Sequence, residues 1–151
     1  MDNKNPPLFI GADHAGYKLK EELKQKLNEL GYSLVDLSKE IPNPADDYPL
    51  IAKILSQEVV KNKGLGLLLC GSGNGVCMAA NKIKGIRAAL GYNTNSAKWA
   101  RTDEDANILC LAGSVLSPEY ALTIAKNFLE TSFSQETRHQ RRIDLLNQLD
   151  Q

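Results

Sequence analysis

Residues Leu65–Gly75 read LGLLLCGSGNG, and this stretch decides the fold. Its first six residues are apolar on both faces, which is typical of a central strand covered by helices on each side. The strand ends on the thiol of Cys70, and a turn that contains three glycines follows. Glycines between a strand and a helix let backbone N–H groups point at an anion. The stretch therefore predicts a central strand that ends in an anion-binding loop.

Short apolar runs and helical patterns alternate along the rest of the chain. Because each expected strand is followed by a helix, we expect a parallel sheet with right-handed crossovers. The prediction is an α/β fold, a single-domain, doubly wound α/β/α sandwich with a Rossmann-like five-stranded parallel sheet. The domain covers residues 1–151, with a frayed tail over 1–7. Strands are expected at 8–10, 33–36, 65–70, 87–90 and 108–111, and helices over a stripe of Leu19, Leu23, Leu27 and Leu30, from Pro49 to Val59, at 75–83, 96–104, from Pro118, and at 136–149.

Composition narrows the classes of function. The 151 residues carry 18 basic and 18 acidic side chains, and this balance argues against a nucleic-acid partner. No apolar run approaches the ~18 residues of a membrane span, and the first residues lack the apolar core of a signal peptide. The three cysteines, Cys70, Cys77 and Cys110, form neither an even disulfide set nor a CxxC pair. Free thiols favour a cytoplasmic protein, and we expect Cys77 and Cys110 to be packing residues.

Ligands of such sheets bind beyond the carboxyl ends of the strands. Three segments are expected there: GADHAG (11–16), CGSGNG (70–75) and GYNTNSAKWARTDED (91–105). In the first, Asp13 could orient a sugar hydroxyl and His14 could contact a phosphate. Alternatively, Asp13 merely caps a helix that starts near Ala15. The two histidines and three cysteines lack metal-ligand spacing, so no metal site is expected.

Spacing around the thiol loop separates the chemistries that use such a loop. A phosphate-binding ATPase loop requires a lysine directly after its last glycine, and here the next lysine is Lys82. The dinucleotide fingerprint follows a first strand and has another glycine spacing. A cysteine phosphatase has an arginine six residues after its thiol, where this chain has Val76. The loop suits an oxyanion held beside a base. The alternative is a tight turn with Cys70 as a small buried apolar residue.

A second group of charges lies in TRHQRRIDLL, residues 137–146. On a helix, Arg138 and Arg142 are four residues apart and share a face, so two guanidinium groups can grip one phosphate. The alternative is a solvated basic helix end.

Five pieces of this sequence carry a resemblance: GADHAG, DYP (47–49), LLCGSGNG (68–75), AANKIKGIRAAL (79–90) and RHQRR (138–142). Together they resemble the type B ribose-5-phosphate isomerase family, which also includes allose- and galactose-phosphate isomerases. The resemblance implies aldose–ketose isomerisation of a sugar phosphate through an enediol, without a metal or other cofactor. It also implies a homodimer, or a pair of dimers, whose active sites combine loops of both subunits, with the helix at 136–151 at the dimer interface.

The resemblance assigns roles to individual residues. Cys70 matches the base that moves the proton, and Ser72 matches the hydroxyl beside it. Some members have a glutamate six residues later, and Val76 at that position indicates the cysteine type. The remaining matches are the loop amides that stabilise the enediolate oxygen, the sugar and phosphate contacts, and the phosphate clamp. They are, in that order, Gly71, Ser72, Gly73, Asn74 and Gly75; Asp13 and His14; and Arg138 and Arg142.

Three positions depart from the family pattern. The usual His-Asn pair aligns with Asp103 and Glu104, and a phosphate-binding arginine aligns with Ser114. Asp103 could act as the ring-opening acid if it is buried, or ring opening could be spontaneous. The sequence leaves three functions open: ribose 5-phosphate/ribulose 5-phosphate isomerase, isomerase of a six-carbon sugar phosphate, and non-catalytic sugar-phosphate binder. Retention of Cys70 and Ser72 speaks against the last.

Overall fold

The computed structural model describes residues 5–150. Its five strands form one parallel sheet in the order β2-β1-β3-β5-β4, which confirms the predicted α/β architecture. The strands are β1 (Leu8–Ala12), β2 (Leu34–Asp36), β3 (Leu65–Cys70), β4 (Ala88–Leu90) and β5 (Ile108–Ala112). The helices are α1 (Tyr17–Glu29), α2 (Tyr48–Asn62), α3 (Asn74–Ala80), α4 (Thr94–Thr102), α5 (Pro118–Leu129) and α6 (Thr137–Asn147).

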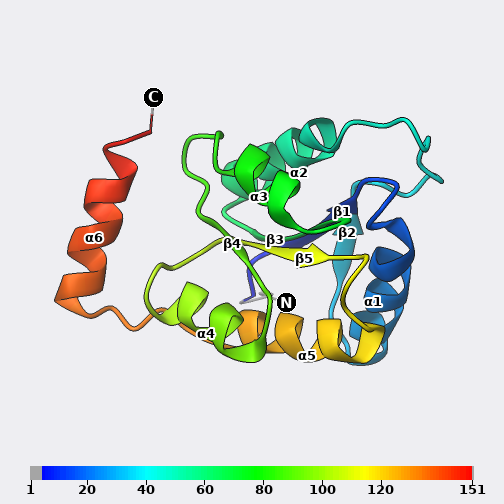
Figure 1. The fold of residues 1–151 in the computed structure, drawn as a ribbon. Coiled ribbons are helices and arrows are strands. Elements are labelled where there is room, and N and C mark those ends of the chain that lie inside the picture. The colour runs from blue at the N-terminus through cyan, green and yellow to red at the C-terminus, as the bar shows by residue number, and fades with distance from the viewer. Residues whose placement is uncertain (1–4, 151) are drawn as a thin grey trace.

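The sheet lies between two helical layers, and β3 is its central strand. Figure 1 shows α2 and α3 on one face of the sheet and α1, α4 and α5 on the other. Each face has its own apolar cluster, and residues of β3 alternate between the two: Leu67 and Leu69 face one cluster, Leu68 and Cys70 the other. Because β3 is buried on both sides, its reactive end is held by the core.

The observed boundaries of three elements differ from the expected ones. One strand is extended by backbone pairing, and two helices are bounded by side-chain hydrogen bonds. Strand β1 continues to Ala12 because it pairs with β3 as far as Leu69. Helix α3 ends at Ala80 because the Asn81 side chain bonds the backbone of Ala88 on β4. Helix α4 begins earlier than predicted, because Asn93 and Ser96 form a reciprocal cap.

One leucine and one isoleucine of the expected helical stripes are not buried. Leu30 is 52% exposed because α1 already ends at Glu29, and Ile54 on α2 is about half exposed. The buried face of α1 consists instead of Leu19, Leu23, Leu27 and, unexpectedly, Lys20.

Helix α6 stands at one end of the molecule, apart from the two layers (Figure 1). Its approach is fixed by the Ser134 amide, which donates to the Thr102 carbonyl, and its far end by Asp150, whose carboxylate accepts from the Gly85 amide at 2.8 Å. Residue 151 of the expected C-terminal segment lies outside the described residues. So do residues 1–4 of the expected N-terminal tail, whereas Pro7 accepts a hydrogen bond from Leu65 N. None of the helices within residues 5–150 has the length and apolarity that a membrane crossing requires.

Candidate active site

The thiol of Cys70 lies where β3 enters its glycine loop. The residue is 4% exposed, and the Gly73 amide donates to its Sγ at 3.2 Å. Gly73 has a φ of +79°, and a Cβ there would lie 2.6 Å from the Leu90 side chain, so the turn that aims this amide requires glycine. Next to it, the Asn74 amide donates to Ser72 Oγ at 3.3 Å. The loop thus directs one backbone N–H group at a sulfur that the core holds in place.

Two further glycines allow the segments after β1 and β5 to contact the backbone at the end of β3. A Cβ at Gly16 would lie 2.5 Å from the Leu69 carbonyl carbon, and one at Gly113 would lie 2.8 Å from Gly16 Cα. The Gly113 amide also donates to the Cys70 carbonyl at 2.8 Å. The ends of β1, β3 and β5 are therefore in backbone-to-backbone contact, which leaves little freedom for the position of Cys70.

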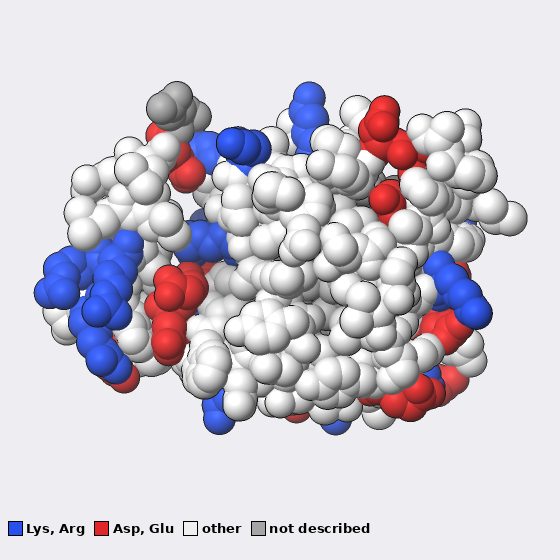
Figure 2. Space-filling model, in the orientation of Figure 1, with Lys and Arg blue, Asp and Glu red and all other residues white. Residues whose placement is uncertain are grey.

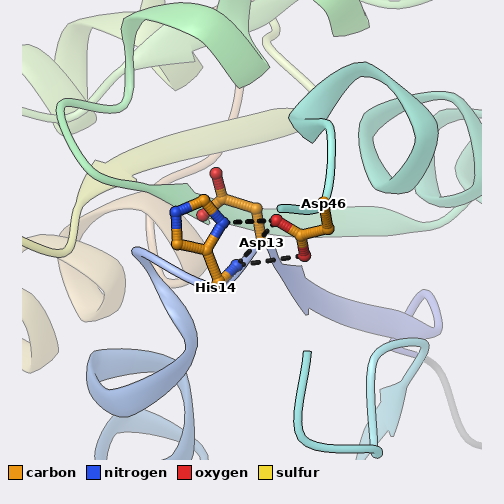
Figure 3. Close-up of side chains that lie close together, drawn as sticks. All are labelled: Asp13, His14 and Asp46. Atoms are coloured by element: carbon orange, nitrogen blue, oxygen red, sulfur yellow. Dashed lines mark hydrogen bonds and ion pairs between the residues drawn. The ribbon is translucent and has the colours of Figure 1, made fainter. Parts of the chain in front are cut away.

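Asp13 and His14 lie at the end of β1, beside this loop. Asp13 is buried, and its Oδ1 accepts from the Gly16 amide at 3.0 Å, so one carboxylate oxygen closes the turn before α1, which begins at Tyr17 rather than Ala15. His14 pairs with Asp46: its amide donates to Oδ2 at 3.1 Å, and its Nδ1 lies 2.5 Å from Oδ1 (Figure 3). The sequence prediction missed Asp46, although it directly precedes the DYP motif.

The pairing with Asp46 fixes the electrostatics of His14. The hydrogen bond that the Asp46 carboxylate accepts raises the pKa of the imidazole; desolvation lowers this pKa, and the charges of Asp13 and Asp46 raise it further. The second ring nitrogen points away from Asp46 (Figure 3) and is free to donate to a ligand. Ligands of a tetrahedral zinc ion lie ~3.3 Å apart. The 2.5 Å separation of His14 Nδ1 and Asp46 Oδ1 is instead that of a direct hydrogen bond between the two side chains.

Two more side chains border the thiol loop. The Tyr48 ring lies against Gly75, whose Cβ would approach Tyr48 Cζ to 2.7 Å. Tyr48 belongs to the DYP motif but was not among the predicted site residues. Ser114, which the resemblance aligns with a phosphate-binding arginine, donates its amide to the Gly71 carbonyl at 3.0 Å. The position of this expected departure therefore lies directly beside the loop.

Asp103 and Glu104 lie at the opposite edge of the sheet from Cys70. Helix α4 occupies most of segment 91–105 and returns the chain to the amino ends of the strands. The carbonyl of Glu104 accepts from Nε of Arg87 at 3.0 Å, just before β4. The expectation that this whole segment lies at the carboxyl edge is wrong, because the segment contains a full crossover helix.

Asp103 contacts the approach to α6. Its Oδ1 accepts from the Thr102 hydroxyl at 2.7 Å and lies 3.9 Å from Nδ1 of the buried His139. The same ring nitrogen is 2.8 Å from Ser134 Oγ. The side chain of Asp103 is 41% exposed, so one chain alone does not supply the burial on which its role as ring-opening acid depends.

The two arginines of the expected phosphate clamp are exposed on α6. Arg138 pairs with Glu136 through Nε at 2.8 Å, and Arg142 lies one turn further along. Figure 2 shows the basic side chains gathered on the α6 end of the molecule, where α6 carries Arg138, Arg141 and Arg142.

The predicted site residues therefore fall into two groups, one at each edge of the sheet. We call them the carboxyl-edge half-site and the amino-edge half-site. The members of each group lie at the same edge of the sheet, and the two groups lie at opposite edges. The carboxyl-edge half-site is Asp13, His14, Cys70, Gly71, Ser72, Gly73, Asn74 and Gly75, and the amino-edge half-site is Asp103, Glu104, Arg138 and Arg142.

Comparison with known proteins gives one consistent result. Residues 8–146 match the Ribose/Galactose Isomerase family. The ribose-5-phosphate isomerase B of Mycobacterium leprae is 38% identical over 140 residues, which cover 92% of this chain and 86% of that protein. The crystal structure of a ribose 5-phosphate isomerase from Thermotoga maritima is 38% identical, with a TM-score of 0.90, over 95% of this chain and 99% of the other. The ribose-5-phosphate isomerase B of Mycoplasma genitalium with bound ribulose-5-phosphate is 40% identical, with a TM-score of 0.89, over 94% of each chain.

Proposed function

The chain belongs to the ribose/galactose isomerase family, and on that premise we propose that Cys70 is the base with which it interconverts ribose 5-phosphate and ribulose 5-phosphate. The relatives named above are ribose-5-phosphate isomerases, and this chain matches them over most of their length. The structure of one of them contains bound ribulose-5-phosphate. The observation that carries the assignment of the base is the buried thiol at the end of β3, whose Sγ accepts a hydrogen bond from the Gly73 amide.

The loop geometry suits proton transfer through an enediolate. The thiolate of Cys70 removes the proton from C2 of the open-chain aldose, and negative charge moves to the carbonyl oxygen O1. The hydroxyl proton then passes from O2 to O1, the thiol returns a proton to C1, and the carbonyl group of the ketose forms at C2. The Gly73 amide holds the sulfur, and the other amides of residues 71–75 stabilise the developing oxyanion. Such stabilisation lowers barriers by several kcal/mol. Ser72 supplies a hydroxyl beside the base.

The separation of the half-sites supports a homodimer. A chain whose phosphate clamp lies at the far edge from its base can complete a site only with a second copy, and two-fold symmetry then yields two identical sites. In this dimer, α6 brings Arg138 and Arg142 to the partner's carboxyl-edge half-site. Helix α6 and the residues that follow it expose Leu145, Leu146 and Leu149, which would be covered in the dimer. A pair of such dimers would leave the same sites intact.

A groove at the carboxyl edge is complementary to α6. It has a volume of about 650 Å³, lies between α2 and the segment that follows β2, and includes Asp46 in its lining. Exposed Leu50 and Ile54 contribute apolar surface, and Asp47 and Glu40 contribute acidic charge. Basic and leucine-rich α6 matches both properties.

The remaining residues receive their roles from the same assembly. In the dimer, Asp103 and Glu104 reach the sugar of the partner's site, where Asp103 is covered and acts as the ring-opening acid. Asp13 uses its second carboxylate oxygen for a sugar hydroxyl, and His14 donates its free ring nitrogen to the substrate. The three free thiols suit a cytoplasmic location.

The first test is ketose formation from ribose 5-phosphate by the purified protein. Cys70→Ala should lower kcat by ~10³-fold or more, because no other group can take the C2 proton. Cys77→Ala, a half-buried thiol on α3 outside the loop, serves as the matched control and should keep the activity. An unaffected Cys70→Ala would remove Cys70 from the role of base. Folded but inactive wild-type protein would overturn the pentose assignment, and allose 6-phosphate would be tested next.

A further inference from the structure

Lys20 is the most unusual buried residue of the chain. It lies on α1 with 0% exposure, and a buried ammonium group is costly unless it is well paired. Its Nζ donates to Asp36 Oδ2 at 2.9 Å and to the Ser38 carbonyl at 2.7 Å, and it lies 2.7 Å from Glu21 Oε1. The ring of Tyr17 covers it at 4.6 Å. None of these groups belongs to either half-site.

Ser38 connects this buried cluster to the active-site edge. Strand β2 ends at Asp36, so β1 has no strand neighbour on that side beyond this point. The Ser38 hydroxyl takes the place of the missing strand and accepts from the Ala12 amide at 2.9 Å. Ser38 is itself fixed twice, through its amide to Asp36 Oδ1 at 2.9 Å and through its carbonyl to Lys20. Lys20 is thus two hydrogen bonds away from the end of β1.

Three consecutive amides at the end of β1 are anchored on three separate segments. The Ala12 amide donates to Ser38, the Asp13 amide to the Leu69 carbonyl at 3.2 Å, and the His14 amide to Asp46 at 3.1 Å. The direction in which His14 leaves the sheet depends on all three. Only the first anchor relies on a side chain that is in turn held by a buried charge.

We propose that Lys20 is a positioning residue for substrate binding, which acts through Ser38 and the Ala12 amide to aim His14 at the sugar phosphate. The proposal rests on the proposed function, in which His14 contacts the substrate. It separates Lys20 from its neighbour Lys24, which binds Asp36 Oδ2 at 2.7 Å and Glu21 at 2.9 Å but does not contact Ser38. If the cluster served stability alone, the two lysines would be equivalent in every measurement of His14.

The test compares Lys20→Met with Lys24→Met. The chain has two histidines, so an NMR titration of the imidazole Cε1–H groups gives one signal for His14 and one for His139 as an internal reference. In Lys20→Met, the contact of His14 with Asp46 should loosen, and the midpoint of its titration should fall toward the ordinary histidine value while His139 is unchanged. The groups that face His14 are Asp13 and Asp46, and neither is altered. The KM for ribose 5-phosphate should rise about tenfold, with kcat changed less than about threefold.

A second pair of variants keeps the proposal testable if Lys20→Met does not fold. Ser38→Ala removes the anchor of Ala12 and should reproduce both shifts, whereas Ser38→Thr retains a hydroxyl and should restore them. Folded Lys20→Met and Ser38→Ala proteins with unchanged His14 titration and KM would overturn the proposal, as would equal effects of Lys20→Met and Lys24→Met. The NMR readout needs no turnover, so an inactive wild-type protein would count against the proposed function and not against this role of Lys20.

Discussion

The half-sites at the two edges of the sheet are built from different groups: backbone at one edge and exposed side chains at the other. At the carboxyl edge, strand ends, glycines and amides surround a buried thiol, and few atoms there can move. At the amino edge, the groups are long or exposed side chains at the end of α4 and on α6. Two of the three positions expected from the sequence to depart from the family pattern, Asp103 and Glu104, lie at this second edge. The carboxyl edge is fixed by the backbone, whereas the exposed side chains of the amino edge can change at less cost to the fold.

The strongest test of this comparison inactivates one half-site in one chain and the other half-site in a second chain. Arg138→Ala with Arg142→Ala should lower kcat/KM by ~10²-fold, because two charge-assisted hydrogen bonds to phosphate are lost. When this variant is unfolded and refolded with an equal amount of Cys70→Ala, each mixed dimer contains one intact site. Activity should return to about a quarter of the wild-type value.

The control for this experiment is each variant refolded alone, which should stay inactive. If the mixture also stays inactive although mixed dimers form, base and clamp act within one chain, and the assignment of the half-sites to different subunits is wrong.

The rigidity of the carboxyl edge can be measured as stability. Gly16→Ala should lower the free energy of unfolding by at least ~2 kcal/mol, because its Cβ would meet the Leu69 backbone at 2.5 Å. The matched change at the amino edge is Leu149→Ala, at a residue that is 75% exposed. It should change the stability of the subunit by less than ~0.5 kcal/mol. Denaturant unfolding of both variants, at a protein concentration where the dimer is dissociated, measures the two losses in the free energy of unfolding. Equal losses would remove the contrast between the edges.

The smallest expected effect concerns Asp103. Asp103→Asn should slow ketose formation from ribose 5-phosphate by only about tenfold, less than the ~10²-fold or more that loss of a general acid usually costs, because spontaneous ring opening remains. Exchange of deuterium from solvent into C1 of ribulose 5-phosphate needs no ring opening and should keep its rate. Asp103→Glu, which retains a carboxyl group, should be closer to wild type. If exchange slows as much as ketose formation, Asp103 acts in the proton transfer itself and not in ring opening.

Sequence patterns located the carboxyl edge well, because its signals are local. The bounds of β3 were predicted to the residue, since both faces are apolar and a glycine ends the strand. The pairing of His14 with Asp46 spans 32 residues and leaves no periodic signal. The burial of Lys20 was missed because its partners, Asp36 and Ser38, come from another strand end.

The amino edge was harder to predict for a related reason. Residues 91–105 contain a complete crossover helix, and its start is marked only by the side-chain cap of Asn93 and Ser96. Without that boundary, Asp103 could be assigned to the wrong edge of the sheet. The position of α6 depends on isolated contacts, such as that between Asp150 and Gly85, which no local pattern announces.

The contact of Gly16 and Gly113 with the end of β3 constrains how this chain could evolve toward another sugar. Any side chain at either glycine would displace the backbone that carries the thiol, so these positions are closed to gradual adaptation. Ser114 and Glu104, by contrast, are exposed and accept replacement. If related proteins change substrate, we therefore expect their substitutions at such exposed positions, while the glycine loop stays the same. Directed evolution of this enzyme should begin its libraries there.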